Sequence, residues 1–201
     1  MGNSYQKNFS LQREKTINSH DVVDIVLIAN DYIISNPEGM ELEIFDFKKK
    51  LTKKIKYNSP DYIIKFHPKY ENVFLFADIN IMKIIEITKD EFELKEKIIV
   101  TEHTQPIKIA EFSKTDDETF VTYSSNNTIK IWNIKNPFCI CNIYICNLIL
   151  DIQLYNNFIF YYDKVESKLI KYNYDEFNMV KAFKVRGKKP KFIILNEENL
   201  L

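Results

Sequence analysis

Apolar and polar residues alternate over short stretches along most of this chain. The clearest stretch is IKIWNI, residues 129–134, where apolar side chains are interrupted by Lys130 and Asn133 and where the only tryptophan, Trp132, lies. A period of two is typical of a β-strand with one buried face. Long stretches with apolar residues at every third or fourth position are missing from the sequence, so the pattern predicts an all-β chain with few helices.

The pattern around Trp132 recurs along the chain. A large apolar or aromatic anchor followed by an acidic or amide residue also occurs in LEIFDF (42–47), in MKIIEI (82–87) and, less closely, in LIKYNY (169–174). The four anchors are Phe45, Ile85, Trp132 and Tyr172, with spacings of 40, 47 and 40 residues. A period of this length indicates a repeat architecture. Further apolar runs lie on both sides of the anchors, so each unit has room for four short strands.

Residues 102–134 resemble a WD repeat almost from end to end. His103 stands where that family has the histidine of its Gly-His pair, Ser124 matches the second-strand serine, and Trp132 matches the tryptophan of the Trp-Asp pair. The sequence departs from the family at four positions, where the family has Gly, Asp, Gly and Asp and this chain has Glu102, Asn126, Asn127 and Asn133. The chain is thus similar to WD-repeat β-propellers, with one well-matched repeat at about 102–145 and three degenerate ones.

This resemblance implies about four four-stranded blades within residues 19–201. The expected units are 20–58, 59–101, 102–146 and 147–186, with the start of a fifth from 190. Residues 1–18 form an N-terminal segment that could supply a ring-closing strand. A ring of seven units at ~40–45 residues each needs on the order of 300 residues. The 201 residues therefore predict an incomplete ring or a fragment of a larger propeller.

Composition narrows the choice of function. Lys and Arg total 28, and so do Asp and Glu, which gives a net charge of zero and argues against nucleic acid or an anionic membrane as the partner. Only three glycines occur, so the glycine-rich loops that bind phosphate are absent. Apolar residues make up 45% of the chain, enough for a sizeable core, yet no uninterrupted apolar run reaches the ~20 residues that a membrane span needs.

Three cysteines lie close together, at Cys139, Cys141 and Cys146, with no second Cys/His pair nearby. This arrangement predicts free thiols in a reducing compartment, with neither a disulfide framework nor a metal site. We therefore expect an intracellular protein, cytoplasmic or nuclear, without a cofactor. The first residues resemble a myristoylation signal, but Gln6 stands where Ser or Thr is expected, so acylation of Gly2 stays open.

No catalytic residue is predicted, because no serine has the glycine pattern of a nucleophile elbow. Instead, the resemblance and the chemistry of the side chains predict a buried network of hydrogen bonds within one blade, made by His103, Ser124, Asn126 and Trp132. An unpaired member of such a network costs about 1–3 kcal/mol, so these residues are expected to be structural.

The resemblance implies a rigid platform that contacts other proteins through its rim. The corresponding positions are Pro106, Lys108 and Ser125, with Pro60 and Tyr62 one blade earlier. We therefore predict a non-catalytic scaffold or adaptor within a multiprotein complex.

Three alternatives remain open. A nucleic-acid- or phosphoinositide-binding propeller would use the lysine clusters at Lys48–Lys54 and at Lys188 and Lys189. An enzyme, or a regulatory part of one, would need a site in the central channel. Self-association through an open blade face is the third alternative, because an incomplete ring exposes apolar surface.

Overall fold

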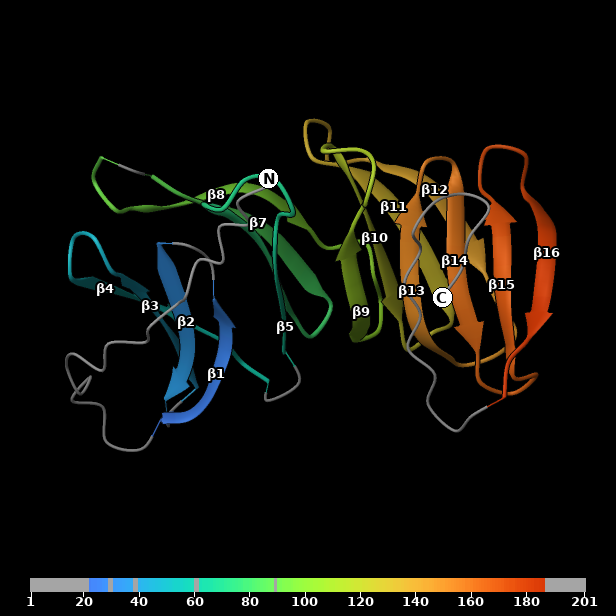
Figure 1. Ribbon diagram of the computed structural model, residues 1–201, viewed down its shortest axis with the longest axis horizontal. Helices are drawn as coiled ribbons and strands as arrows, with labels where there is room; N and C mark the ends of the chain where they lie inside the picture. Colours follow the sequence, from blue (N-terminus) through green and yellow to red (C-terminus); the bar gives the residue numbers. More distant parts are fainter. Residues whose placement is uncertain (1–21, 29–30, 38–39, 60–61, 89, 187–201) are drawn as a thin grey trace, which may run out of the picture.

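The computed structural model describes residues 22–28, 31–37, 40–59, 62–88 and 90–186. Within these ranges the chain forms sixteen β-strands and no helix (Figure 1). The strands make four antiparallel sheets of four strands each, which confirms the all-β prediction. The predicted ring-closing strand (1–18) and the predicted start of a fifth unit (from 190) lie outside the described residues.

Each sheet is a meander, in which strands that follow one another in the chain pair with one another. The first sheet contains β1 (Val22–Ile28), β2 (Tyr32–Pro37), β3 (Glu41–Asp46) and β4 (Leu51–Lys56). The second contains β5 (Tyr62–Phe66), β6 (Val73–Asp78), β7 (Ile81–Ile87) and β8 (Leu94–Val100). The third contains β9 (Ile107–Phe112), β10 (Thr119–Ser124), β11 (Thr128–Asn133) and β12 (Cys139–Tyr144). The fourth contains β13 (Ile149–Tyr155), β14 (Phe158–Asp163), β15 (Lys168–Asn173) and β16 (Asn178–Lys184).

The four repeat anchors all lie on the third strand of a sheet, and the residue after the anchor shapes the next turn. In the first sheet the Asp46 carboxylate accepts hydrogen bonds from the backbone N–H groups of Lys48 (2.8 Å) and Lys49 (2.9 Å). Asn133 and Asn173 accept equivalent backbone bonds in the third and fourth sheets. Such Asx turns explain why an acid or amide follows the anchor. The second sheet has Glu86 there, which forms an ion pair with Lys97 at 2.6 Å instead.

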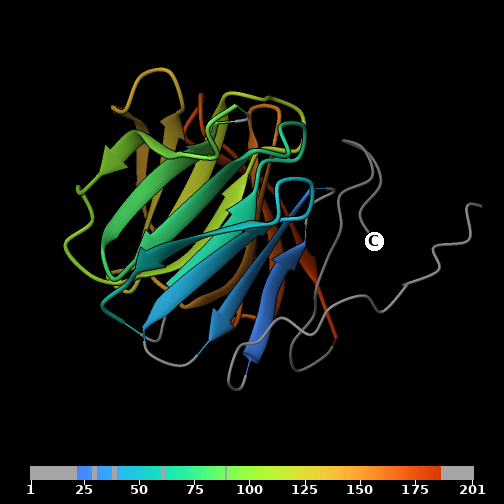
Figure 2. The same cartoon turned by 90° about the vertical axis from the view of Figure 1, so that its left-hand side faces the viewer.

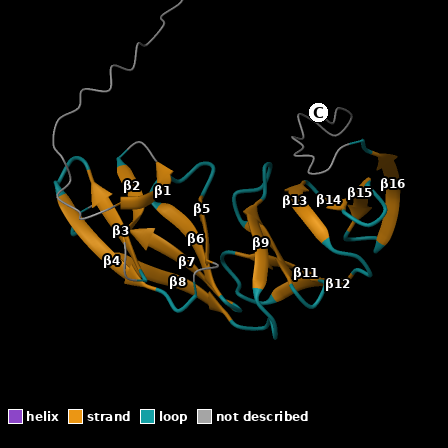
Figure 3. Ribbon diagram, turned by 90° about the horizontal axis from the view of Figure 1, so that it is seen from below, coloured by secondary structure: helices purple, strands orange, loops and turns teal. Residues whose placement is uncertain are grey.

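The core lies between the sheets. Apolar side chains of the first and second sheets form one cluster, those of the second and third another, and those of the third and fourth a third. The sheets stack face to face (Figure 2) in an open arc, with the first and fourth at its ends (Figure 3). Trp132 is fully buried between the second and third sheets, where its ring stacks on Phe120 at a centroid distance of 6.2 Å. Burial on both faces explains the short, strongly apolar strands.

Several connections place a non-glycine residue in the left-handed region. Eight such residues have φ between 48° and 62°, and all lie between strands: Met40, Lys50, Ile79, Phe92, Asn127, Asn156, Ser167 and Phe177. Asparagine tolerates this conformation, but a β-branched residue such as Ile79 is strained in it. The strand pairings hold the six residues other than asparagine in a conformation that they disfavour.

Candidate functional site

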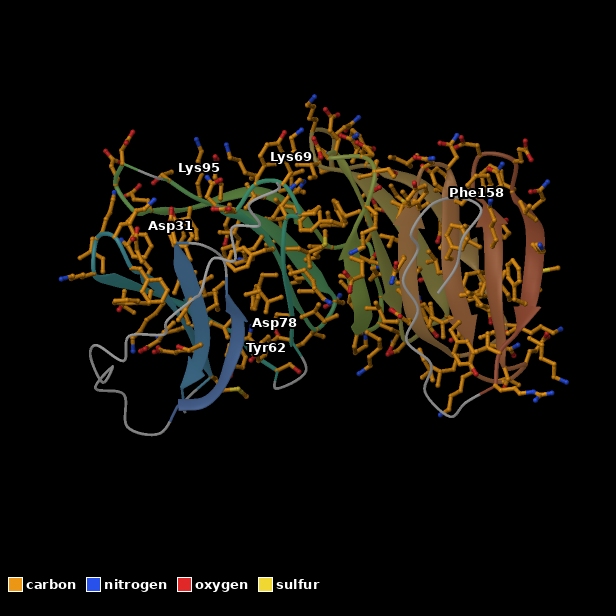
Figure 4. The ribbon with its side chains drawn as sticks, viewed as in Figure 1. Asp31, Tyr62, Lys69, Asp78, Lys95 and Phe158 are labelled. Carbon is orange, nitrogen blue, oxygen red and sulfur yellow. The ribbon has the colours of Figure 1, made fainter. Side chains whose placement is uncertain are left out.

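The connections divide the arc into two rims. One rim, called here the loop rim, carries the loops that join one sheet to the next and the turns between second and third strands. Tyr62 and Asp78 lie at the loop rim in Figure 4, whereas Asp31, Lys69 and Lys95 lie toward the opposite rim. The predicted contact residues Tyr62, Pro106, Lys108 and Ser125 are all at or beside the loop rim. Pro60 lies outside the described residues.

The structure brings the three predicted residues of the third sheet together. Ser125, in the turn between β10 and β11, donates its backbone N–H to the carbonyl of Pro106 at 2.9 Å. Lys108 follows two residues later on β9, and both Lys108 and Ser125 are exposed. This part of the rim is therefore a formed surface whose backbone is fixed by hydrogen bonding.

Two further bonds join this surface to the second sheet. The backbone N–H of Ile107 donates to the carbonyl of Ile79 at 2.7 Å, and the Asn80 side chain donates to the carbonyl of His103 at 2.8 Å. Ile79 and Ile81 are 40% and 39% exposed beside them. The loop rim is thus continuous across two sheets, and Lys108 directly follows the residue that is bonded to Ile79.

Tyr62 has a different environment. Its ring lies 4.8 Å from that of Tyr57 and 6.4 Å from that of Phe76, and it packs against the cluster between the first and second sheets. Its strand partner Asp78 accepts two bonds from Asn58, at 2.8 and 3.0 Å. Tyr62 is half-buried, so much of its surface serves packing between sheets.

A buried hydroxyl, that of Thr122, joins two of the predicted network residues. The Trp132 indole N–H donates to the Thr122 oxygen at 2.8 Å, and His103 Nε2 lies 2.7 Å from the same oxygen. The exposed fractions are 0% for Trp132 and Thr122 and 1% for His103. His103 therefore ties the loop before β9 to the centre of the third sheet.

The remaining bonds carry this chain to the surface. His103 Nδ1 lies 3.4 Å from the Thr128 hydroxyl, Thr128 donates to the Asn126 carbonyl oxygen at 2.6 Å, and the Asn126 amide donates to the Thr104 hydroxyl at 3.2 Å. Each hydroxyl has one proton to donate. The Thr122 oxygen accepts the indole proton, and its own proton can go to His103 Nε2 at 2.7 Å or to the Lys130 carbonyl at 3.5 Å. We assign it to His103 Nε2, because that acceptor is closer. His103 then donates from Nδ1 to the Thr128 hydroxyl, and Thr128 gives its own proton to Asn126.

Ser124 lies outside this chain of bonds, although it was the hydroxyl expected in it. Its side chain donates to the carbonyl of Gln105 at 2.8 Å. Ser124 is on the same face of β10 as Thr122 but two residues further along, which is roughly 6–7 Å. Thr122 and Thr128 were missed. The sequence carries no signal for Thr122, because its approach to Trp132 depends on the strand register that pairs Phe120 with Trp132.

The surroundings of His103 keep its imidazole neutral. Burial and, to a lesser extent, the nearby Lys130 ammonium lower the pKa of His103 from 6.5 to about 4. Lys130 itself lies 3.1 Å from Glu102 and 5.6 Å from the centre of the Trp132 ring. A neutral ring is what the bonds require, because Nε2 must accept a proton from Thr122 while Nδ1 donates.

The lysines near residue 50 are interleaved with acids. Lys48 Nζ lies 2.6 Å from Asp31, and Lys54 Nζ lies 3.2 Å from Glu41 and 3.0 Å from Glu43. These pairs offset the charges of Lys48 and Lys54, and the Lys49 ammonium donates to the backbone carbonyl of Asp90. Lys188 and Lys189 lie outside the described residues.

Within the described residues, the thiols and the possible metal ligands are not grouped into a site for chemistry. Burial raises the pKa of Cys139 and that of Cys141, the latter to about 11, so both thiols stay protonated at neutral pH. The described ranges contain no group of three or more His, Cys, Asp or Glu side chains placed to hold a metal ion. Nor does the described part of the chain contain a helix able to cross a membrane.

Solved structures define the class of fold. No protein-family profile and no curated protein sequence matches the chain. Sqt1 of Saccharomyces cerevisiae is similar with a TM-score of 0.65 and 14% identity, over 78% of this chain and 48% of Sqt1. The WD40 domain of Toxoplasma gondii coronin is similar with a TM-score of 0.68 and 13% identity, over 81% of this chain and 45% of the coronin chain. KlHsv2 with loop 6CD replaced by a Gly-Ser linker is similar with a TM-score of 0.65 and 14% identity, over 83% of this chain and 55% of the KlHsv2 chain.

The fold is therefore that of a WD-repeat β-propeller, and the described residues form four of its blades in an open arc. The chain spans about half the length of these structures. The resemblance found in residues 102–145 is confirmed at the level of the fold.

Proposed function

We propose that this chain is a non-catalytic scaffold that binds other proteins through the loop rim of its second and third blades. The observation that carries the proposal is the bonded chain from Trp132 through Thr122 and His103. These bonds attach the loop before β9 to the buried centre of the third sheet, and the Ser125–Pro106 bond attaches it to the turn between β10 and β11. A surface that is already ordered loses little conformational entropy when a partner binds.

The chemistry of the surface supports a protein partner. Lys108 directly follows Ile107, whose backbone is bonded to the partly exposed Ile79, so a basic residue and apolar contact area belong to the same stretch of the rim. Interfaces commonly combine an apolar centre with polar groups around it. We propose a partner surface with an apolar anchor and an acidic group, supplied by another member of a multiprotein complex. Polyanion binding is less supported, because Lys48 and Lys54 have acidic neighbours.

Charge reversal at the two rims tests the proposal. Lys108→Glu changes the loop rim of the third blade, and Lys114→Glu changes an exposed lysine just beyond the other end of the same strand, at the opposite rim. We expect proteins captured from lysate by the full-length chain to be lost with Lys108→Glu and kept with Lys114→Glu, at equal melting temperatures. Equal capture by both variants would contradict the loop rim as the binding surface.

A further inference from the structure

The outward face of the fourth sheet, turned away from the third, carries a buried aromatic cluster. Phe160 is 0% exposed, Tyr162 2% and Leu169 5%. Partly buried side chains surround them: Leu150, Tyr155, Phe158, Phe183 and Val185. All of these residues belong to the fourth sheet, except Val185, which follows it directly. Since each of the other three clusters takes residues from two neighbouring sheets, this one is half of an interface between sheets.

The two ends of the arc differ in chemistry. The outward face of the first sheet carries Glu41, Glu43 and Lys54, with the lysine paired to both acids at 3.2 and 3.0 Å, beside the half-buried Ile33 and Phe45. Charged groups on an outer face help the end of a repeat protein to meet water. The outward face of the fourth sheet is mainly aromatic, with the Lys171 ammonium 3.9 Å from the centre of the Phe158 ring, and Figure 1 shows this sheet at the end of the arc. A second copy stacking its first sheet there would take Glu41, Glu43 and Lys171 out of water, and the desolvation of these charges is costly.

The chain itself continues with an apolar segment at a suitable distance. Residues 190–195, PKFIIL, carry a single charge, on Lys191. Connections between one sheet and the next have five residues (57–61), six (101–106) and four (145–148). The five residues 185–189 would make a connection of the same length.

We propose that residues 190–195 bind the outward face of the fourth sheet as the first strand of a fifth blade. In β9 the first, fourth and sixth residues contact the preceding sheet, and so do those of β13. These residues are Ile107, Ala110 and Phe112 in β9, and Ile149, Ile152 and Leu154 in β13. The same spacing turns Ile193 and Leu195 toward Phe160 and Tyr162, and turns Ile194 to the other side of the strand. This inference concerns the architecture and does not depend on the proposed binding function.

Two neighbouring isoleucines provide a matched test in the full-length chain. Ile193→Asp should lower the melting temperature by roughly 5–10 °C, because it places a carboxylate on a buried aromatic surface. Ile194→Asp should change it by less than about 2 °C. Amide hydrogen exchange across β14 should speed up in the first variant only. Equal melting temperatures for the two variants, or a wild-type value for Ile193→Asp, would overturn the proposal.

Light scattering distinguishes this arrangement from a second copy on the same face. The proposal expects the wild-type chain to be a monomer whose β14 amides are protected. A dimer that Phe158→Lys converts to a monomer would overturn it, because a second copy would then cover the cluster. If Ile193→Asp does not fold, Ile193→Ala and Ile194→Ala give the same comparison with smaller shifts, and equal shifts would again refute it.

Discussion

Replacing Thr122 by valine removes one hydroxyl from the centre of the third blade and leaves its shape nearly unchanged. In the wild-type chain this oxygen accepts the Trp132 indole proton at 2.8 Å and lies 2.7 Å from His103 Nε2. Both partners are almost completely buried, so water cannot replace the hydroxyl. The variant therefore leaves one donor and one acceptor unpaired.

The magnitude follows from these two groups. A buried polar group without a partner costs about 1–3 kcal/mol, so Thr122→Val should lower the free energy of unfolding by about 2–5 kcal/mol. For a chain of about 200 residues this corresponds to a fall in melting temperature of roughly 5–15 °C. Valine fills nearly the same volume as threonine, so no cavity contributes to the loss.

Thermal and urea denaturation, followed by circular dichroism, measure the effect. Thr119→Val is the matched control, because Thr119 is a buried threonine on the same strand whose side-chain hydroxyl forms no hydrogen bond with the described part of the chain. It should cost less than about 1 kcal/mol. A double-mutant cycle with Trp132→Phe should show a coupling of roughly 0.5–3 kcal/mol. Equal losses for the two valine variants, together with zero coupling, would show that the bonded chain does not stabilise the blade.

Two further predictions concern His103 and Asn133. Burial, together with the Lys130 charge, lowers the pKa of His103 from 6.5 to about 4. Below pH 6.5 the imidazole of His103 therefore binds a proton in the unfolded chain but stays neutral in the folded chain. Stability should then fall as the pH drops from 6.5 to 4, by up to about 3 kcal/mol. Urea midpoints at pH 7 and pH 5 should differ less in His103→Gln than in the wild type, and equal differences would refute the assignment. Asn133→Ala should cost about 1 kcal/mol through loss of its turn bonds, whereas Asn133→Asp should melt no lower than the wild type; a melting temperature for the aspartate variant as low as that of the alanine variant would contradict this reasoning.

The repeat could be predicted from sequence because one physical constraint recurs in it. Phe45, Ile85, Trp132 and Tyr172 occupy the same place on the third strand of successive sheets, where a large side chain meets the neighbouring strand. The polar residue after the anchor could also be predicted in three sheets, because a short acid or amide there accepts backbone hydrogen bonds from the following turn. Glu86 is longer and breaks this rule, so the second sheet is the most weakly marked of the four at this position.

The hydroxyl of the bonded chain could not be predicted in the same way. The strand TFVTYS places Thr122 and Ser124 on one face, and both are small and polar. Only the register of β10 against β11, with Phe120 opposite Trp132, decides that the indole reaches Thr122. Tyr62 shows a similar limit. Its position at the start of a strand suggested an exposed contact, but the distance between neighbouring sheets decides how much of its ring is buried.

The left-handed turns have a consequence for how this protein folds. A hairpin whose turn residues favour its geometry can begin to form by itself, but residues such as Ile79 and Met40 oppose the geometry of their turns at a cost of roughly 1–2 kcal/mol each. The pairing of strands must therefore be selected by the apolar faces of adjacent sheets, which meet only after two blades have been synthesised. Folding should proceed by the joining of neighbouring blades, so a ribosome-bound chain that ends inside the second blade would have little stable structure.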